Sequence, residues 1–238
     1  MTEKAALVAF LLREAGLRVV SLARVACCSH TVNFRAVVED GRLVLVKLAS
    51  PHCRLATVDH PLAAHDLFPD RTFLFGERRV FCLEWKIGRP KTLAALSAKA
   101  VDRLLAAYGS FRAALGEGRI HGDLNCNNVL FADGAVSAFL DLEAVRAGHP
   151  CEDWIRYALT GAEHLPVFAW LRRRRVAANL ARIAAATGYP PSEWHAAIDG
   201  FEAAKCARKR RRGRLSWFAR ANLAWRHRYY ARLKEMLR

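Results

Sequence analysis

The chain has 238 residues, of which 53% are hydrophobic and 25% are charged. This balance is typical of a globular protein with a sizeable core, and it excludes a disordered chain, a collagen and a disulfide-stabilised miniprotein. The longest clean apolar run, residues 5–12, is far shorter than the roughly 20 residues of a membrane-spanning helix. No cleavage-site pattern follows the first residues, so we expect no signal peptide.

Positive charge is concentrated at one end of the chain. The formal net charge is +16, and residues 171–238 hold 18 of the 38 Lys and Arg residues but only 4 of the 22 Asp and Glu residues. The excess is therefore a local property of the C-terminal quarter. The seven cysteines form no CxxC pair, a usage typical of reduced thiols in the cytoplasm.

The first part of the chain is rich in β-strand patterns. An amphipathic helix is expected over 4–16, and strands over 34–39 and 42–48 flank an Asp40-Gly41 turn. Asp-Gly between two such runs is a strong hairpin signal. The other elements expected here are a strand start at 19–20, a short helix over 61–68, and strands over 72–75 and 80–85.

The second part is expected to be mostly helical. Apolar residues recur on one face over 92–115, which predicts a helix that Gly116 and Gly118 end. A loop over 120–128, a second Asp-Gly hairpin over 129–140 and further helices from about 152 follow. We therefore predict an α+β fold with a small antiparallel β-rich lobe over 1–87 and a larger, mostly helical lobe over 88–238.

One polar segment carries the chemistry. Asn128 precedes a tight hairpin and Asp141 follows it, so an amide oxygen and a carboxylate can converge on one hard cation. Mg²⁺ prefers oxygen ligands and takes only one or two carboxylates beside substrate phosphates. Asp123 lies upstream, where it can accept a proton from a hydroxyl group. This division of labour suits phosphoryl transfer, in which positioning and charge neutralisation do most of the work.

His121-Gly122-Asp123, with Asn128 five positions after the Asp and Asp141 beyond the hairpin, resembles a known superfamily. It looks like the catalytic and metal-binding loops of the aminoglycoside phosphotransferase, choline kinase and lipopolysaccharide-core sugar kinase group, which has a protein-kinase-like fold. The resemblance implies ATP and Mg²⁺ as cofactors, with Asp123 as catalytic base and Asn128 and Asp141 as metal ligands. It also implies that the lobe over 1–87 binds the nucleotide and that the lobe over 88–238 holds the catalytic loop, the metal site and the acceptor.

The same resemblance assigns roles to a wider set of residues. It implies that Lys47 contacts the ATP phosphates, that a loop with Ser29 and Thr31 covers them, that Glu84 and Trp85 hold the adenine, and that His121 and Asp153 support the catalytic loop. Two features depart from the family pattern. The loop over 28–33 has no glycine, and residues 51–70 contain no Glu to pair with Lys47, which leaves Asp66 as the expected partner.

The C-terminal quarter combines basic runs with an aromatic stripe. Trp225, Tyr229, Leu233 and Leu237 follow helical spacing among arginines. A basic helix of this kind can lie on an anionic membrane. Core packing is the commoner use of such spacing, so we expect the stripe to pack on the helical lobe. Nucleic acid is a weaker candidate because no binding motif accompanies the arginines.

We therefore expect an ATP- and Mg²⁺-dependent phosphotransferase in the cytoplasm, peripheral on the inner face of the membrane. Because a basic region disfavours a cationic acceptor, the expected acceptor is an anionic small molecule or a lipid-linked sugar of lipopolysaccharide-core type. Two alternatives stay open: a soluble kinase of choline, aminoglycosides or sugars, and an inactive kinase fold that binds a membrane or nucleic acid. The intact Asp123, Asn128 and Asp141 favour an enzyme, whereas the glycine-free loop and missing Glu favour the inactive fold.

Overall fold

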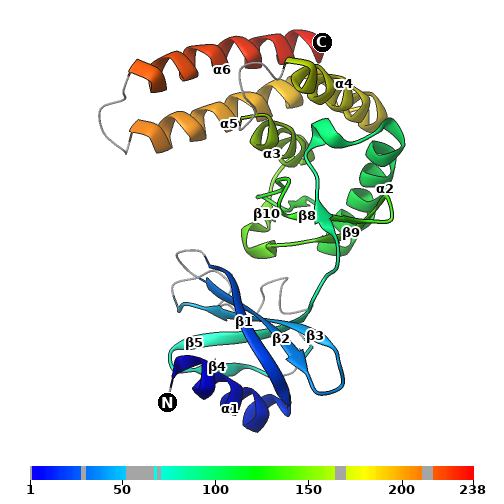
Figure 1. Cartoon of the computed structure of the whole chain (residues 1–238). Helices are drawn as coiled ribbons and strands as arrows, with labels where there is room; N and C mark the ends of the chain where they lie inside the picture. Colours follow the sequence, from blue (N-terminus) through cyan, green and yellow to red (C-terminus); the bar gives the residue numbers. More distant parts are fainter. Residues whose placement is uncertain (1, 28–30, 52–66, 69–70, 164–169, 211–216) are drawn as a thin grey trace. The chain divides into compact units, whose positions relative to one another are not determined.

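The computed structural model describes residues 2–27, 31–51, 67–68, 71–163, 170–210 and 217–238. The chain divides into two compact units, Met1–Lys86 and Ile87–Arg238, which Figure 1 shows with the helices and strands labelled. The expected short helix over 61–68 lies almost wholly outside the described residues.

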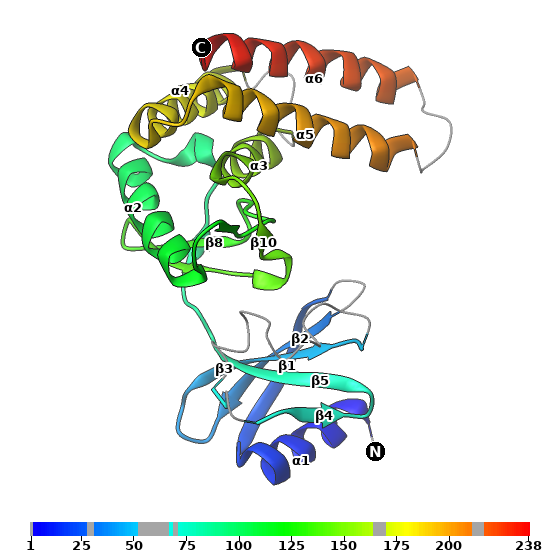
Figure 2. The ribbon, with the colours of Figure 1, turned by 180° about the vertical axis from the view of Figure 1, so that it is seen from behind.

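The N-terminal unit is one helix packed on an antiparallel sheet with the strand order β1-β2-β3-β5-β4. The helix begins where Thr2 Oγ1 accepts a hydrogen bond from the Ala5 N–H, and it ends at Gly16, whose φ of 67° is left-handed. Figure 2 shows this helix beside the sheet. The elements are α1 (Glu3–Ala15), β1 (Val19–Cys27), β2 (Thr31–Val38), β3 (Leu43–Ala49), β4 (Phe73–Phe75) and β5 (Arg78–Glu84).

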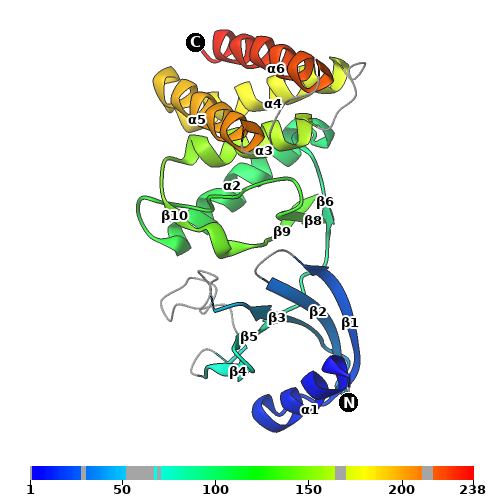
Figure 3. The ribbon, with the colours of Figure 1, turned by 90° about the vertical axis from the view of Figure 1, so that its left-hand side faces the viewer.

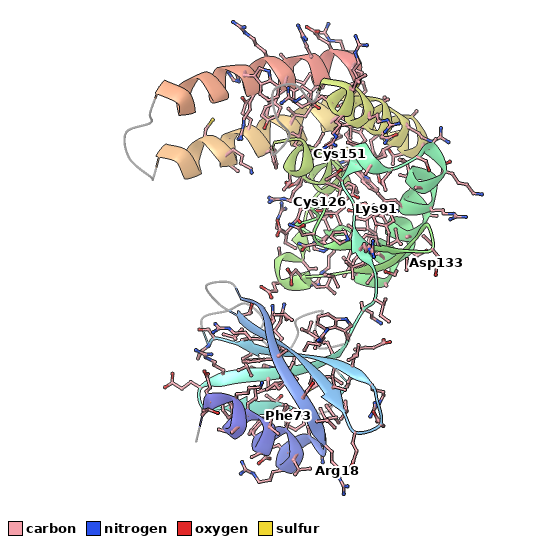
Figure 4. All side chains as sticks on the ribbon, in the orientation of Figure 1. Arg18, Phe73, Lys91, Cys126, Asp133 and Cys151 are labelled. Carbon is pink, nitrogen blue, oxygen red and sulfur yellow. The ribbon has the colours of Figure 1, made fainter. Side chains whose placement is uncertain are left out.

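Alternation along β3 separates the core from the opposite face of the sheet. Val44, Val46 and Leu48 are buried in a core that includes α1 and Phe73, a residue labelled in Figure 4. Lys47 points to the other face because successive strand side chains alternate. Its register partners there are Asn33 on β2 and Phe81 on β5.

The C-terminal unit consists of helices around two small sheets, with the strand orders β10-β7 and β6-β8-β9. Figure 3 shows α4, α5 and α6 together at one end of this unit. The elements are β6 (Arg89–Pro90), a 3₁₀ turn (Leu93–Ala95), α2 (Ala98–Leu115), β7 (Arg119–Ile120), β8 (Val129–Ala132), β9 (Ala135–Phe139), a second 3₁₀ turn (Leu142–Ala144), β10 (Arg146–Ala147), α3 (Pro150–Glu163), α4 (Trp170–Thr187), α5 (Pro191–Arg210) and α6 (Trp217–Met236).

The helix predicted over 92–115 begins later than expected. Ser97 caps α2 by accepting a hydrogen bond from the Ala100 N–H, and residues 93–95 form a separate 3₁₀ turn. The prediction was wrong at this end because the apolar pattern runs through the turn, whereas the capping serine sets the start of the helix. The predicted apolar face itself is buried through Leu104 and Tyr108.

The described part of the C-terminal aromatic stripe packs inside the unit. Tyr230, Leu233 and Leu237 are buried in the same core as α2 and α3. Trp225 stacks on Tyr229 with ring centroids 5.7 Å apart, and the Arg173 guanidinium lies 3.7 Å from the Trp225 ring centre. This packing agrees with the expectation of a core stripe. Within the described ranges, no helix has the length and apolar character needed to cross a bilayer.

The two leucines side by side on α1 give a test of the N-terminal core. Leu11 is fully buried and Leu12 is 51% exposed, so Leu11→Ala should lower the free energy of unfolding by about 2–5 kcal/mol. Leu12→Ala is the matched control, because it changes helix propensity equally, and it should cost no more than about 0.5 kcal/mol. Urea unfolding followed by circular dichroism measures both. Equal losses would contradict the described orientation of α1.

Candidate active site

The centre of the site is the carboxylate of Asp153 in the first turn of α3. It is 1% exposed and accepts three hydrogen bonds. Oδ2 accepts from the His121 N–H at 2.7 Å and from the Tyr108 hydroxyl at 2.6 Å, and Oδ1 accepts from the Gly122 N–H at 2.9 Å. Burial, followed by the charge of Asp153, raises the pKa of Tyr108, so the phenol stays a donor. Asp153 therefore fixes the backbone of the loop that carries Asp123.

Gly122 is required by the shape of this loop. Its φ is +77°, and a Cβ built on it would lie 2.0 Å from the carbonyl oxygen of Ala144. Any larger residue would therefore force the loop away from the 3₁₀ turn that follows Asp141. Close approach of the two backbones places the loop and the Asp141 segment side by side.

His121 links the same two segments through its ring. Its Nε2–H donates to the Leu140 carbonyl at 2.7 Å, and its Nδ1 accepts from the Asp123 N–H at 3.3 Å. A carbonyl can only accept and a backbone N–H can only donate, so the geometry assigns the neutral Nε2–H tautomer. The fully buried ring therefore joins Asp123 to the residue before Asp141.

Asp123 is paired with a residue that the sequence analysis missed. The Arg156 guanidinium donates to Asp123 Oδ1 at 3.0 Å, and Asn125 Nδ2 donates to Oδ2 at 3.3 Å. The side chain of Asp123 keeps 44% of its surface exposed, so it can still meet a reactant. One signal for Arg156 was available: it follows Asp153 by three positions, so both lie on one face of α3.

Asn128 and Asp141 form the part of the site suited to a cation. Asn128 is 5% exposed. Its side-chain Nδ2 donates to the backbone carbonyl of Asp123 at 2.9 Å, and its backbone carbonyl accepts from the Leu140 N–H at 2.8 Å. The side-chain amide is thereby oriented with Oδ1 as the available ligand atom. Asp141 is exposed and has a left-handed φ of 54°, a conformation that Asp tolerates better than most residues.

These two residues fit a magnesium ion that shares its coordination with a nucleotide. Within the described residues, no group of three or more His, Cys, Asp or Glu side chains could hold a metal. One carboxylate and one amide oxygen agree with the preference of Mg²⁺ for few protein ligands beside phosphates and water. The donor set suits Mg²⁺ far better than zinc, which takes sulfur and nitrogen ligands.

The residues expected to bind nucleotide lie in the N-terminal unit. Lys47 and Thr31 are each only 2% exposed. The Trp85 N–H donates to the Leu43 carbonyl at 3.1 Å, and the Glu84 side chain pairs with Lys86. Because the Trp85 N–H is used in this bond, it does not donate to an adenine ring in this arrangement. Ser29 and Asp66 lie outside the described residues, and all these roles stay predictions.

The structure thus brings one group of predicted residues together in the C-terminal unit: His121, Asp123, Asn128, Asp141 and Asp153. With a β-rich unit followed by a helical one, this arrangement is that of a kinase-like phosphotransferase. A family model described as "Phosphotransferase enzyme family" matches residues 39–197, about two thirds of the chain. The chain therefore belongs to the phosphotransferase enzyme family, and the predicted family and enzyme class are confirmed.

Solved structures share the fold at low sequence identity. The macrolide 2′-phosphotransferase MphH of Brachybacterium faecium is 17% identical with a TM-score of 0.57, covering 84% of this chain and 89% of that one. The amicoumacin kinase hAmiN, in complex with AMP-PNP, Ca²⁺ and Ami, is 13% identical with a TM-score of 0.57, covering 99% and 94%. Aminoglycoside phosphotransferase APH(4)-Ia, solved with ADP and hygromycin B, is 12% identical with a TM-score of 0.51, covering 97% and 98%. The predicted α+β, kinase-like fold is confirmed. A search of curated proteins gave no match.

Asp153→Asn tests whether the buried carboxylate holds the catalytic loop. The amide can accept through one oxygen only and would turn its NH₂ group toward a donor, so we expect a loss of about 1–3 kcal/mol or more in unfolding free energy. Tyr108→Phe is the control, since it removes one donor and leaves the two backbone bonds, at a cost of about 1 kcal/mol. Thermal unfolding of both variants measures the difference. An Asp153→Asn variant as stable as Tyr108→Phe would contradict the role of the carboxylate.

Proposed function

We propose that the protein transfers the γ-phosphate of ATP to a hydroxyl group of a small-molecule acceptor, with Asp123 as the general base. The observation that carries this proposal is the amide of Asn128, whose Nδ2 binds the Asp123 carbonyl while its backbone carbonyl accepts from Leu140, the residue before Asp141. One residue, through its side chain and its backbone, thus links the proposed base to the residue before the predicted metal ligand. Solved relatives of the same fold hold AMP-PNP with Ca²⁺ or ADP, which supports a nucleotide with a divalent metal.

Each residue has a defined task in this proposal. Asp123 accepts the proton of the acceptor hydroxyl, and Arg156 orients its carboxylate through the 3.0 Å ion pair. Asn128 and Asp141 hold Mg²⁺, which neutralises charge on the phosphates when bound. In the N-terminal unit, Lys47 contacts the phosphates with the Ser29–Thr31 loop, and Glu84 and Trp85 border the adenine.

The finer part of the proposal concerns the acceptor. Exposed arginines on α4 and α6, namely Arg172, Arg175, Arg228 and Arg232, support an acceptor with anionic groups, such as a lipid-linked sugar of lipopolysaccharide-core type at the inner membrane face. Exposed cations of this kind raise the local concentration of an anionic partner and its rate of encounter. A soluble sugar or drug kinase without a membrane partner is the alternative within the same class.

Binding of Mg²⁺·ATP tests the metal site and separates an enzyme from an inactive fold. ATP with Mg²⁺ at about 100 times its dissociation constant should stabilise the protein by about 2.7 kcal/mol, which raises the melting temperature by several degrees. Asp141→Asn should abolish the part of this shift that depends on Mg²⁺. Asp133→Asn is a matched control because Asp133, at the tip of the β8–β9 hairpin, has the same left-handed backbone, with a φ of 51°, and it should behave as wild type. No shift in the wild type would favour the inactive fold.

Asp123→Asn separates the chemistry from nucleotide binding. The amide cannot accept the proton, so phosphoryl transfer should fall by about 10²–10⁴-fold. The Mg²⁺·ATP-dependent rise in melting temperature should persist, because Asp123 is not among the proposed metal ligands. Release of ADP in the presence of acceptor measures the first quantity and thermal unfolding the second. Unchanged ADP release would exclude Asp123 as the base.

A further inference from the structure

Arg156 on α3 is a cation held against the proposed base. Its guanidinium donates to Asp123 Oδ1 at 3.0 Å, and 25% of its side-chain surface is exposed. A guanidinium has five N–H donors in a fixed plane, and its hydrogen bond within the described residues uses one of them. Donors therefore remain for a second anionic partner next to Asp123.

Neither stability nor the orientation of Asp123 alone requires a full positive charge at this position. An ion pair as exposed as this one adds little to stability, since Asp123 keeps 44% of its side-chain surface exposed. Other groups also orient Asp123: Asn125 Nδ2 donates to Oδ2 at 3.3 Å, and the His121 ring accepts from the Asp123 N–H at 3.3 Å. The charge of Arg156 is therefore explained better by the reaction than by the fold.

The transferred group must pass close to this guanidinium. A hydroxyl that gives its proton to Asp123 lies about 2.6–3.2 Å from the carboxylate. The phosphorus atom that this hydroxyl attacks lies about 3–3.5 Å from the hydroxyl oxygen. The oxygens of the phosphoryl group are therefore within reach of a side chain that is itself bonded to Asp123.

Charge on the phosphoryl group is spread over three oxygens during transfer, and the two oxygens of Asp123 have different neighbours. Asn128, a proposed metal ligand, places its Nδ2 3.5 Å from Oδ2, whereas Arg156 binds Oδ1. Residues 121–128 contain no Lys or Arg, so the catalytic loop itself brings no cation to the phosphoryl group. Arg156 supplies one from α3, on the side of Asp123 away from Asn128.

We infer that Arg156 is a catalytic residue that donates hydrogen bonds to the phosphoryl group while it is transferred. The inference rests on the proposed function and deepens it. As the bond from phosphorus to the ADP oxygen breaks and the bond to the acceptor oxygen forms, the acceptor proton passes to Asp123. Arg156 gives up no proton: it keeps one N–H on Asp123 and directs others to the phosphoryl oxygens. An arginine of the same chain stabilises transition-state charge in this way in some other phosphoryl-transfer enzymes.

Arg156→Gln, which removes the charge but keeps a donor, is the test variant, and Mg²⁺·ADP with aluminium fluoride is the probe. Aluminium fluoride takes the place of the phosphoryl group in transfer, and transition-state analogues bind far more tightly than ground-state ligands. In the wild type it should raise the melting temperature beyond the rise given by Mg²⁺·ADP alone. Arg156→Gln should lose this additional rise and keep the rise given by Mg²⁺·ADP, since Arg156 contacts only the transferred group.

The kinetic readout is release of ADP from Mg²⁺·ATP with water as the acceptor. Loss of a preorganised donor to the transition state should lower kcat by about 10²–10³-fold in Arg156→Gln. The KM for ATP should stay unchanged, because the lost interaction forms only during transfer.

Arg146→Gln is the matched control. It removes the same charge from an arginine whose partner, at 2.6 Å, is Glu152 and not Asp123, so both rises in melting temperature should equal those of the wild type. Arg156→Lys keeps a cation but loses the planar fork. It takes the place of Arg156→Gln if that variant does not fold, and it should lose part of the additional rise.

An additional rise that Arg156→Gln loses and Arg146→Gln keeps would support the inference. A side chain that only orients Asp123 would change ADP release and leave the additional rise in place, and that result would overturn it. Equal losses in both variants, or no additional rise in a wild type that binds Mg²⁺·ADP, would also overturn it. A wild type that Mg²⁺·ADP does not stabilise at all would instead signal failure of the proposed function itself.

Discussion

The site depends on one buried charge that the fold must satisfy. A carboxylate as deeply buried as that of Asp153 is costly unless hydrogen bonds compensate it. The compensation comes from two backbone N–H groups of the catalytic loop and from Tyr108 on α2. Because the Tyr108 ring also packs on Trp154 in the core, with ring centroids 4.5 Å apart, the loop is anchored to the buried core of the unit.

From this anchor the geometry of the loop follows in steps. Gly122 permits the backbone to approach Ala144, and His121 then bridges Asp123 and Leu140 with both ring nitrogens. Asn128 makes a second link between the same two residues, because it bonds to the Asp123 carbonyl and to the Leu140 N–H. Hydrogen bonds within the protein therefore join the loop of the proposed base, Asp123, to the backbone at Leu140, next to the proposed metal ligand. Such preorganisation is what phosphoryl transfer requires, since little energy is then spent on reorganising the site during reaction.

The sequence predicted the parts of the site that local spacing encodes. His121, Asp123, Asn128 and Asp141 lie within one short segment, so motif and hairpin together were enough. Arg156 lies 33 positions from Asp123 and reaches it only because Asp153 docks α3 on the loop. The sequence analysis placed the start of α2 too early, because the apolar pattern continues upstream of Ser97, the residue that caps the helix. The fold class and family were correct, as were the strands around Asp40-Gly41, since their signals are periodic and repeated.

The overall charge of the chain is a property of the whole sequence, and the structure shows that the positive residues lie in two kinds of environment. Arg172 and Arg175 of α4 and Arg228 and Arg232 of α6 are exposed to solvent, where ions screen their effect beyond about 8 Å at physiological salt. Such charges increase the rate at which an anionic partner meets this surface. Beside Asp123 the two arginines are already paired, Arg156 with Asp123 and Arg146 with Glu152. The net charge of the chain therefore describes an exposed surface of the helical unit and does not describe the charge balance beside Asp123.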